Sequence, residues 1–124
     1  MSTTARALIA CAAWAVLAGA ASGPAAAHES PSFDCASARH AAEQIVCRDA
    51  GLARVDRNLD VTYRRLMQEA GFFGRIKLRN EERAFLKDRD ACESDYTCVR
   101  VTYRGQMQTF RDRSKQLGVV LDYE

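Results

Sequence analysis

The chain has 124 residues, enough for one domain of ordinary size, and its 18 basic and 16 acidic residues give a formal net charge of +2. Acidic residues alternate with basic ones along the chain, as they do on the solvated surfaces of helices. This balance gives no electrostatic case for nucleic-acid binding, which needs a strongly basic face.

The first 27 residues have the composition of a secretory signal peptide. Arg6 precedes an apolar stretch from Ala7 to Ala21, and small residues follow up to Ala27. The stretch is shorter than a membrane-spanning helix needs, so we predict cleavage after Ala27, rather than a retained anchor, and no remaining membrane span. Cleavage removes one basic and no acidic residue, which leaves a net charge of about +1. Lipidation at Cys11 is the alternative, although most apolar residues follow this cysteine instead of preceding it.

Residues 28–39 contain Pro31 and show no periodicity, so they are expected to form an irregular lead. A short helix is expected over residues 40–48. Asp49 then has the character of an N-cap, because its carboxylate can accept hydrogen bonds from the first free amides of a second helix. That helix is expected to reach about residue 70, since it has a stripe at 4-3-4-3-4 spacing that comprises Leu52, Asp56, Leu59, Tyr63, Leu66 and Ala70.

The segment Gly71-Phe72-Phe73-Gly74 interrupts this pattern and predicts a turn between helices. A third helix to about Cys92 follows, with the stripe Leu78, Glu82, Phe85, Arg89 and Cys92. Glu93-Ser94-Asp95 is a second break, in which Ser94 or Asp95 caps a fourth helix. That helix has the stripe Val99, Tyr103, Met107, Phe110 and Leu117.

The predicted fold class follows from these elements, because no segment alternates with a period of two. We predict an all-α, disulfide-stapled antiparallel bundle of about three long helices plus one short N-terminal helix. The helical domain is expected over residues 40–117, followed by a tail over residues 118–124.

Four cysteines remain after cleavage, and an even number in a small exported domain predicts two disulfides. On continuous helices, the Cα atoms of Cys92 and Cys98 would lie about 9 Å apart, and those of Cys35 and Cys47 about 18 Å apart. Both distances exceed the reach of a disulfide, but the break at residues 93–95 and a folded-back lead would let each pair meet. We therefore favour the local pairing over free or metal-binding cysteines, for which no histidine spacing gives support.

Asp56 and Arg89 interrupt stripes that are otherwise apolar. A hairpin folded about the predicted turn places Asp56 opposite Arg89 and Tyr63 opposite Glu82. We predict a structural ion pair between Asp56 and Arg89 in the seam, where an arginine can bind a carboxylate through two nitrogens. The alternative places both residues at the exposed edge of the seam, where such a pair stabilises the fold very little.

The sequence contains no pattern typical of an enzyme. It has no phosphate-binding glycine loop, no nucleophile elbow and no His-Glu-x-x-His motif. Only two histidines are present, and oxidised cysteines cannot serve as nucleophiles. We therefore expect a non-catalytic protein that needs neither a cofactor nor a metal.

Several motifs together carry a resemblance to a known family. They are Phe33-Asp34-Cys35, Glu43 to Cys47, Leu52 to Asp56, Arg89-Asp90-Ala91-Cys92 and Cys98-Val99. With this spacing, the chain resembles the lysozyme inhibitor LprI-like N-terminal domain over about residues 33–117. It departs from the family where Ala41 and Ala42 precede Glu43 in place of Thr-Pro, and where Phe85 replaces a usual tryptophan.

The resemblance implies a periplasmic or secreted binding domain whose partner is a lysozyme. The alternative is a structural or envelope-interaction module without lysozyme inhibition. A lysozyme cleft contains two catalytic carboxylates, and an inhibitor can occlude it or place a cation beside them. The predicted turn would offer Phe72, Phe73 and Arg75 for this contact, unless both phenylalanines fold back onto the core. Lysozymes are commonly basic, so a net charge near +1 provides no long-range attraction.

Overall fold

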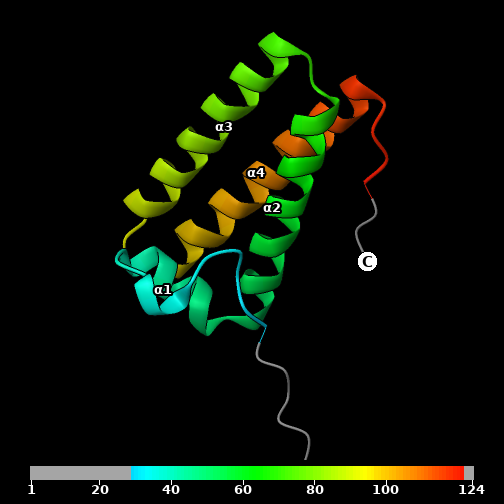
Figure 1. The fold of residues 1–124 in the computed structure, drawn as a ribbon. Helices are drawn as coiled ribbons and strands as arrows, with labels where there is room; N and C mark the ends of the chain where they lie inside the picture. The colour runs from blue at the N-terminus through cyan, green and yellow to red at the C-terminus, as the bar shows by residue number, and fades with distance from the viewer. Residues whose placement is uncertain (1–28, 122–124) are drawn as a thin grey trace, which may run out of the picture.

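The computed structural model describes residues 29–121, which form four α-helices and one short 3-10 helix (Figure 1). No strand occurs in this part of the chain, so the predicted all-α class is confirmed. The predicted signal peptide and Cys11 lie outside the described residues. The elements in chain order are η1 (Cys35–Ser37), α1 (Ala41–Arg48), α2 (Ala50–Glu69), α3 (Phe72–Ala91) and α4 (Tyr96–Leu117).

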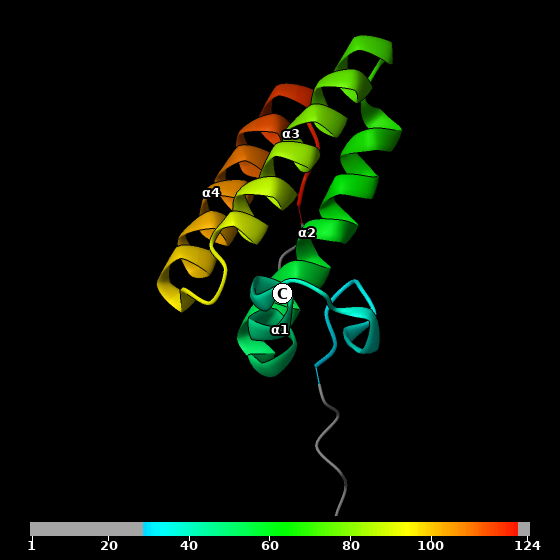
Figure 2. The same ribbon diagram turned by 90° about the vertical axis from the view of Figure 1, so that its left-hand side faces the viewer.

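The three long helices run alongside one another in alternating directions, and α1 lies across one end of the bundle (Figures 1 and 2). α4 packs against both α2 and α3. The junction between α2 and α3 lies at the end of the bundle away from α1. The short helix therefore covers the end at which α2 and α4 begin and α3 terminates. This placement brings the lead and α1 close to the seam between α2 and α3.

The helix ends follow from local side-chain chemistry. Asp49 accepts a hydrogen bond from the Leu52 amide at 2.9 Å, which confirms it as the N-cap of α2. Asp95, and not Ser94, caps α4 by accepting from the Cys98 amide at 2.9 Å. Gly118 ends α4 with a φ of 67°, a left-handed conformation that glycine adopts without strain.

The hydrophobic core is formed mainly by apolar residues of the predicted stripes, to which α1 adds Ala42 and Val46 and α2 adds Ala53. Tyr63, Met107 and Leu117 are partly buried and pack against it. Tyr103 and Phe85 meet edge to face, with ring centroids 5.1 Å apart. Such large side chains each stabilise the fold by roughly 1.5–3 kcal/mol on full burial. The fully or nearly buried apolar residues are Ala42, Val46, Leu52, Ala53, Leu59, Leu66, Ala70, Leu78, Phe85, Cys92, Val99, Tyr103 and Phe110.

The junction between α2 and α3 is tighter than the sequence predicted. α2 ends at Glu69 and α3 begins at Phe72, so the expected turn over residues 71–74 is wrong at its C-terminal side. Gly74 lies in the first turn of α3, where an added Cβ would be only 3.1 Å from the Cβ of Ala70. The glycine therefore permits a close approach of the two helices. The Arg75 Nε atom donates to the Ala70 carbonyl at 2.9 Å and satisfies the end of α2.

Both predicted disulfides are present. The Cα atoms of Cys35 and Cys47 are 5.8 Å apart, and those of Cys92 and Cys98 are 5.5 Å apart. The first bridge fastens the lead to α1, and the second fastens the end of α3 to the start of α4. The break between these two helices includes Glu93 with a φ of 51°, which helps the chain reverse within a few residues.

Removing either disulfide should lower the free energy of unfolding. The double change Cys92→Ala/Cys98→Ala is expected to lower it by about 2 kcal/mol, and Cys35→Ala/Cys47→Ala by about 3 kcal/mol, because the Cys35–Cys47 bridge closes the longer loop. Urea unfolding followed by circular dichroism measures both values. The larger effect is expected for the longer loop because its closure restricts the unfolded chain more. If both variants have the same free energy of unfolding as the parent chain, the prediction is contradicted.

Candidate functional site

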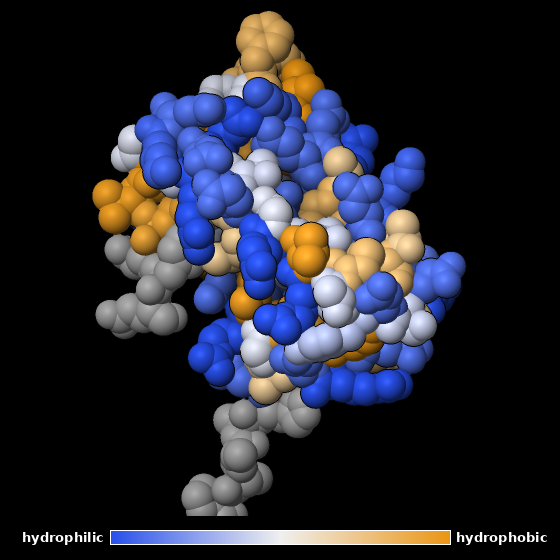
Figure 3. Space-filling view, turned by 180° about the vertical axis from the view of Figure 1, so that it is seen from behind, coloured by the Kyte–Doolittle hydropathy of each residue, from blue (hydrophilic) through white to orange (hydrophobic). Residues whose placement is uncertain are grey.

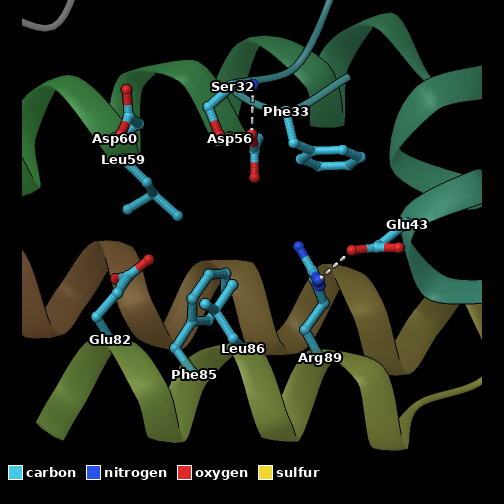
Figure 4. A pocket seen from close by; sticks show the side chains of 10 residues that line it. All are labelled: Ser32, Phe33, Glu43, Asp56, Leu59, Asp60, Glu82, Phe85, Leu86 and Arg89. Carbon is cyan, nitrogen blue, oxygen red and sulfur yellow. Dashed lines mark hydrogen bonds and ion pairs between the residues drawn. The ribbon is translucent and has the colours of Figure 1, made fainter. Parts of the chain in front are cut away.

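A cavity with a volume of about 270 Å³ lies between α2 and α3, beside α1 and the lead (Figure 4). Four carboxylates and one guanidinium line it, so negative charge is in excess. We call it the acidic pocket. Its charged residues are Glu43, Asp56, Asp60, Glu82 and Arg89, and its other lining residues are Ser32, Phe33, Leu59, Phe85 and Leu86.

Asp56 connects the lead to the core at the floor of this pocket. Its Oδ2 atom accepts hydrogen bonds from the Ser32 amide at 2.7 Å and from the Ser32 hydroxyl at 2.6 Å. Its Oδ1 atom accepts from the Tyr103 hydroxyl at 2.7 Å. Burial, together with the Asp56 carboxylate, raises the pKa of Tyr103 far above its ordinary value. The tyrosine therefore acts here as a neutral hydrogen-bond donor.

Arg89 connects α3 to α1 on the other side of the pocket. Its Nη2 atom lies 3.0 Å from Glu43 Oε1 and 2.7 Å from Asp90 Oδ1, and only 5% of its side chain is exposed. Glu43 also accepts from the amides of Arg39 at 2.8 Å and His40 at 3.1 Å, so it caps the start of α1. Burial alone would raise the pKa of Glu43, but these amides and Arg89 lower it below its ordinary value.

The predicted ion pair between Asp56 and Arg89 is not formed. The hydrogen bonds of Asp56 come from Ser32 and Tyr103, and the ion pairs of Arg89 are with Glu43 and Asp90. The two side chains do point toward one another across the pocket, from α2 and α3 respectively (Figure 4). Asp56 and Arg89 thus line the same pocket, as the hairpin predicted, without an ion pair between them. Both residues are buried, so the exposed-edge alternative is wrong as well.

Glu82 is the least compensated carboxylate of the acidic pocket. Its Oε2 atom accepts a single hydrogen bond, from Gln106 at 3.3 Å. Burial raises the pKa of Glu82 above its ordinary value; the Gln106 bond opposes this effect, and the nearby Asp56 and Asp60 carboxylates add to it. Its charge at neutral pH is thus unfavourable in the folded state.

The change Glu82→Gln should stabilise the protein at pH 7. Folding raises the pKa of this carboxyl, so the native state binds its proton more tightly than the unfolded state does. The free energy of unfolding therefore falls as the pH rises from the pKa of the unfolded state through the pKa of the folded state. The amide removes this charge and can still accept from Gln106. The gain should vanish at about pH 4, where the carboxyl is largely protonated in the folded state. Urea unfolding at both pH values tests this, with the exposed Glu69→Gln as the control. A gain that persists at low pH would contradict it.

The start of α3 projects from the bundle and exposes three apolar side chains beside an arginine. We call this segment the hairpin tip and define it as Phe72, Phe73, Arg75 and Ile76. The side chains of Phe72, Phe73 and Ile76 are 73%, 82% and 41% exposed. The two phenylalanine rings meet edge to face at 5.3 Å. Hydrophobic residues project at the top of the molecule, where α3 begins (Figure 3). The phenylalanines therefore do not fold back onto the core.

Metal ligands, membrane spans and cysteines were considered within the described part of the chain. Within residues 29–121, no group of three or more histidine, cysteine or acidic side chains is arranged to hold a metal ion. In the same residues, no helix combines the length and apolarity needed to cross a bilayer. All four described cysteines are held in disulfides.

Several residues of the acidic pocket were not assigned to a site by the sequence. Ser32 and Phe33 lie in the lead, which has no periodicity. Phe33 belongs to a motif of the family resemblance, but nothing near it in the sequence indicated a pocket. Glu43 could have been identified, because a glutamate three residues after an N-cap position is typical of the start of a helix. Its pairing with Arg89 depends on the tertiary fold.

Comparison with known protein families finds a match. The sequence matches the family described as lysozyme inhibitor LprI over residues 35–117. The matched range contains all four α-helices and both disulfides. No curated protein and no solved structure matches the chain.

Proposed function

The chain belongs to the lysozyme inhibitor LprI family, and we propose that it is an exported, non-catalytic domain that binds and inhibits a cell-wall-degrading lysozyme. Two disulfides support a periplasmic or extracellular location, because such bonds persist in oxidising compartments. The family supports a protein partner. The observation that carries the proposal beyond the family is the exposed hairpin tip.

The hairpin tip has the properties of an interface anchor. Phe72 and Phe73 together expose a large apolar surface at the end of a helical hairpin. Aromatic side chains each bury about 150–250 Å² when they enter a pocket, and they are frequent at the centres of binding interfaces. Because both belong to α3, their backbone is already ordered and loses little entropy on binding. We therefore place the tip in the substrate cleft of the lysozyme.

The distribution of charge over the surface favours an encounter with a basic lysozyme, although the net charge of the chain does not. Four carboxylates and a single arginine line the acidic pocket between α2 and α3. Lysozymes are commonly basic, so this face would attract them at short range although the whole chain is nearly neutral. The attraction would weaken as the ionic strength rises, because charges in solution are screened over about 8 Å at physiological salt.

A lysis assay tests the proposal directly. The purified chain, with both disulfides formed, is added to an animal-type lysozyme, and the clearing of a cell-wall suspension is followed. We expect lysis to be suppressed in proportion to the amount of chain added. The same chain lacking both disulfides serves as the control. Undiminished lysis at a large molar excess would instead favour a structural or envelope-interaction module.

A further inference from the structure

A second depression lies between α2 and α4. Two adjoining cavities, with volumes of about 380 and 390 Å³, share Leu52, Val55 and Arg100 and therefore form one continuous groove. We call it the α2–α4 groove. It has no lining residue in common with the acidic pocket, so the two features occupy different surfaces of the bundle.

The α2–α4 groove has an apolar floor and a basic edge. Leu52 is buried, and Val55 and Met107 are partly buried against the core. The exposed side chains of Arg100, Arg104 and Arg111 line the groove from α4. The outer two arginines are eleven positions apart on the helix, which spreads them over roughly 16 Å. The view from behind, where α4 lies nearest, shows hydrophilic residues beside hydrophobic ones (Figure 3).

Basic side chains outnumber acidic ones among the residues that line the groove, with three arginines and one aspartate. Asp49 is the only acidic residue among its lining residues, and its carboxylate already accepts from the Tyr96 hydroxyl at 2.7 Å and from the Leu52 amide at 2.9 Å. The Arg100 guanidinium lies 5.6 Å from the centre of the Tyr96 ring. Arg104 has no ion-pair partner among residues 29–121. Positive charge therefore gathers here and negative charge gathers in the acidic pocket.

We propose that the α2–α4 groove docks an acidic amphipathic helix of a second protein. A groove between two helices accepts the apolar face of a third helix, and acidic residues along one side of that helix would meet the arginines. A bilayer fits less well, because membrane-binding helices present an outward apolar face, whereas this apolar floor lies below the arginine side chains. A basic lysozyme would be repelled, so this surface is separate from the proposed inhibitory one.

Fluorescence anisotropy with a labelled synthetic peptide tests the docking. The peptide has about 18 residues, or about five helical turns, with leucines on one face and glutamates beside them. A matched peptide has lysines in place of the glutamates. We expect the purified chain to bind the acidic peptide, with weaker binding as salt rises, and to bind the basic peptide at least about tenfold less tightly. Absence of acidic-peptide binding, or equal binding of both peptides, would overturn the proposal.

Variants locate the binding surface. Arg100→Glu/Arg104→Glu should weaken acidic-peptide binding at least about tenfold, and the milder Arg104→Gln should weaken it less. The control Arg79→Glu/Arg83→Glu makes the same charge change on the exposed side of α3 and should leave binding unchanged. Circular dichroism verifies folding, and lysozyme inhibition should be unaffected. Equal loss in the control, or binding only to phosphatidylglycerol vesicles, would overturn the proposal.

Discussion

Replacing Arg89 by methionine is expected to lower the free energy of unfolding by about 3 kcal/mol. The guanidinium is almost completely buried and lies within hydrogen-bond distance of both Glu43 and Asp90. It also lies 5.5 Å from the centre of the Phe33 ring, so it helps hold the lead on the bundle. Methionine fills a similar volume but leaves two partly buried carboxylates without their counter-charge. Urea unfolding at pH 7 measures the loss.

Double-mutant cycles identify the partner of Arg89. The cycle with Glu43→Gln should give a coupling energy of about 1–3 kcal/mol, because these side chains are in direct contact. The cycle with Asp56→Asn should give a smaller value, because these side chains face each other only across the pocket. Arg83→Met, at an exposed position on the same helix, should change stability by less than about 0.5 kcal/mol. A larger coupling energy with Asp56 than with Glu43 would instead indicate a direct ion pair between Arg89 and Asp56.

The sequence was sufficient to predict the helices because their signals are local. The stripe spacing on α2 and α4 and the capping carboxylates of Asp49 and Asp95 each act within a few residues. The disulfide pairing followed from the short separations of the cysteines and the breaks between them. The signals that place α3 are weaker. Gly74 suggests a turn in the sequence, whereas in the structure it allows α3 to begin close to Ala70.

The partners of Asp56 and Arg89 could not be predicted, because they come from distant parts of the chain. The register of the hairpin was enough to turn both side chains toward one pocket. Ser32 is 24 residues from Asp56, and Glu43 is 46 residues from Arg89. No periodic pattern indicates how the lead folds back across α2 or how α1 closes the end of the bundle. These placements depend on packing between elements, which a single sequence does not reveal.

The double change Phe72→Ala/Phe73→Ala is expected to have the largest effect on function. If the hairpin tip anchors the complex, each phenylalanine should contribute about 2 kcal/mol or more. The half-inhibitory concentration in the lysis assay should then rise about a thousandfold or more. Folding should be preserved, because both side chains are exposed and alanine has a higher helix propensity than phenylalanine. A thermal unfolding midpoint close to that of the parent chain would show this.

The matched control is Val61→Ala/Val101→Ala, which removes two exposed apolar side chains that lie outside the tip, on α2 and α4. These valines are 59% and 58% exposed, so a general loss of surface hydrophobicity would affect both variants alike. A loss of inhibition confined to the phenylalanine variant assigns the contact to the tip. Arg75 is a less suitable probe, because its Nε atom also satisfies the end of α2. If the phenylalanine variant inhibits as strongly as the parent chain, the hairpin tip is not the contact site. The acidic pocket is then the next surface to test, and Asp60→Asn is its first variant.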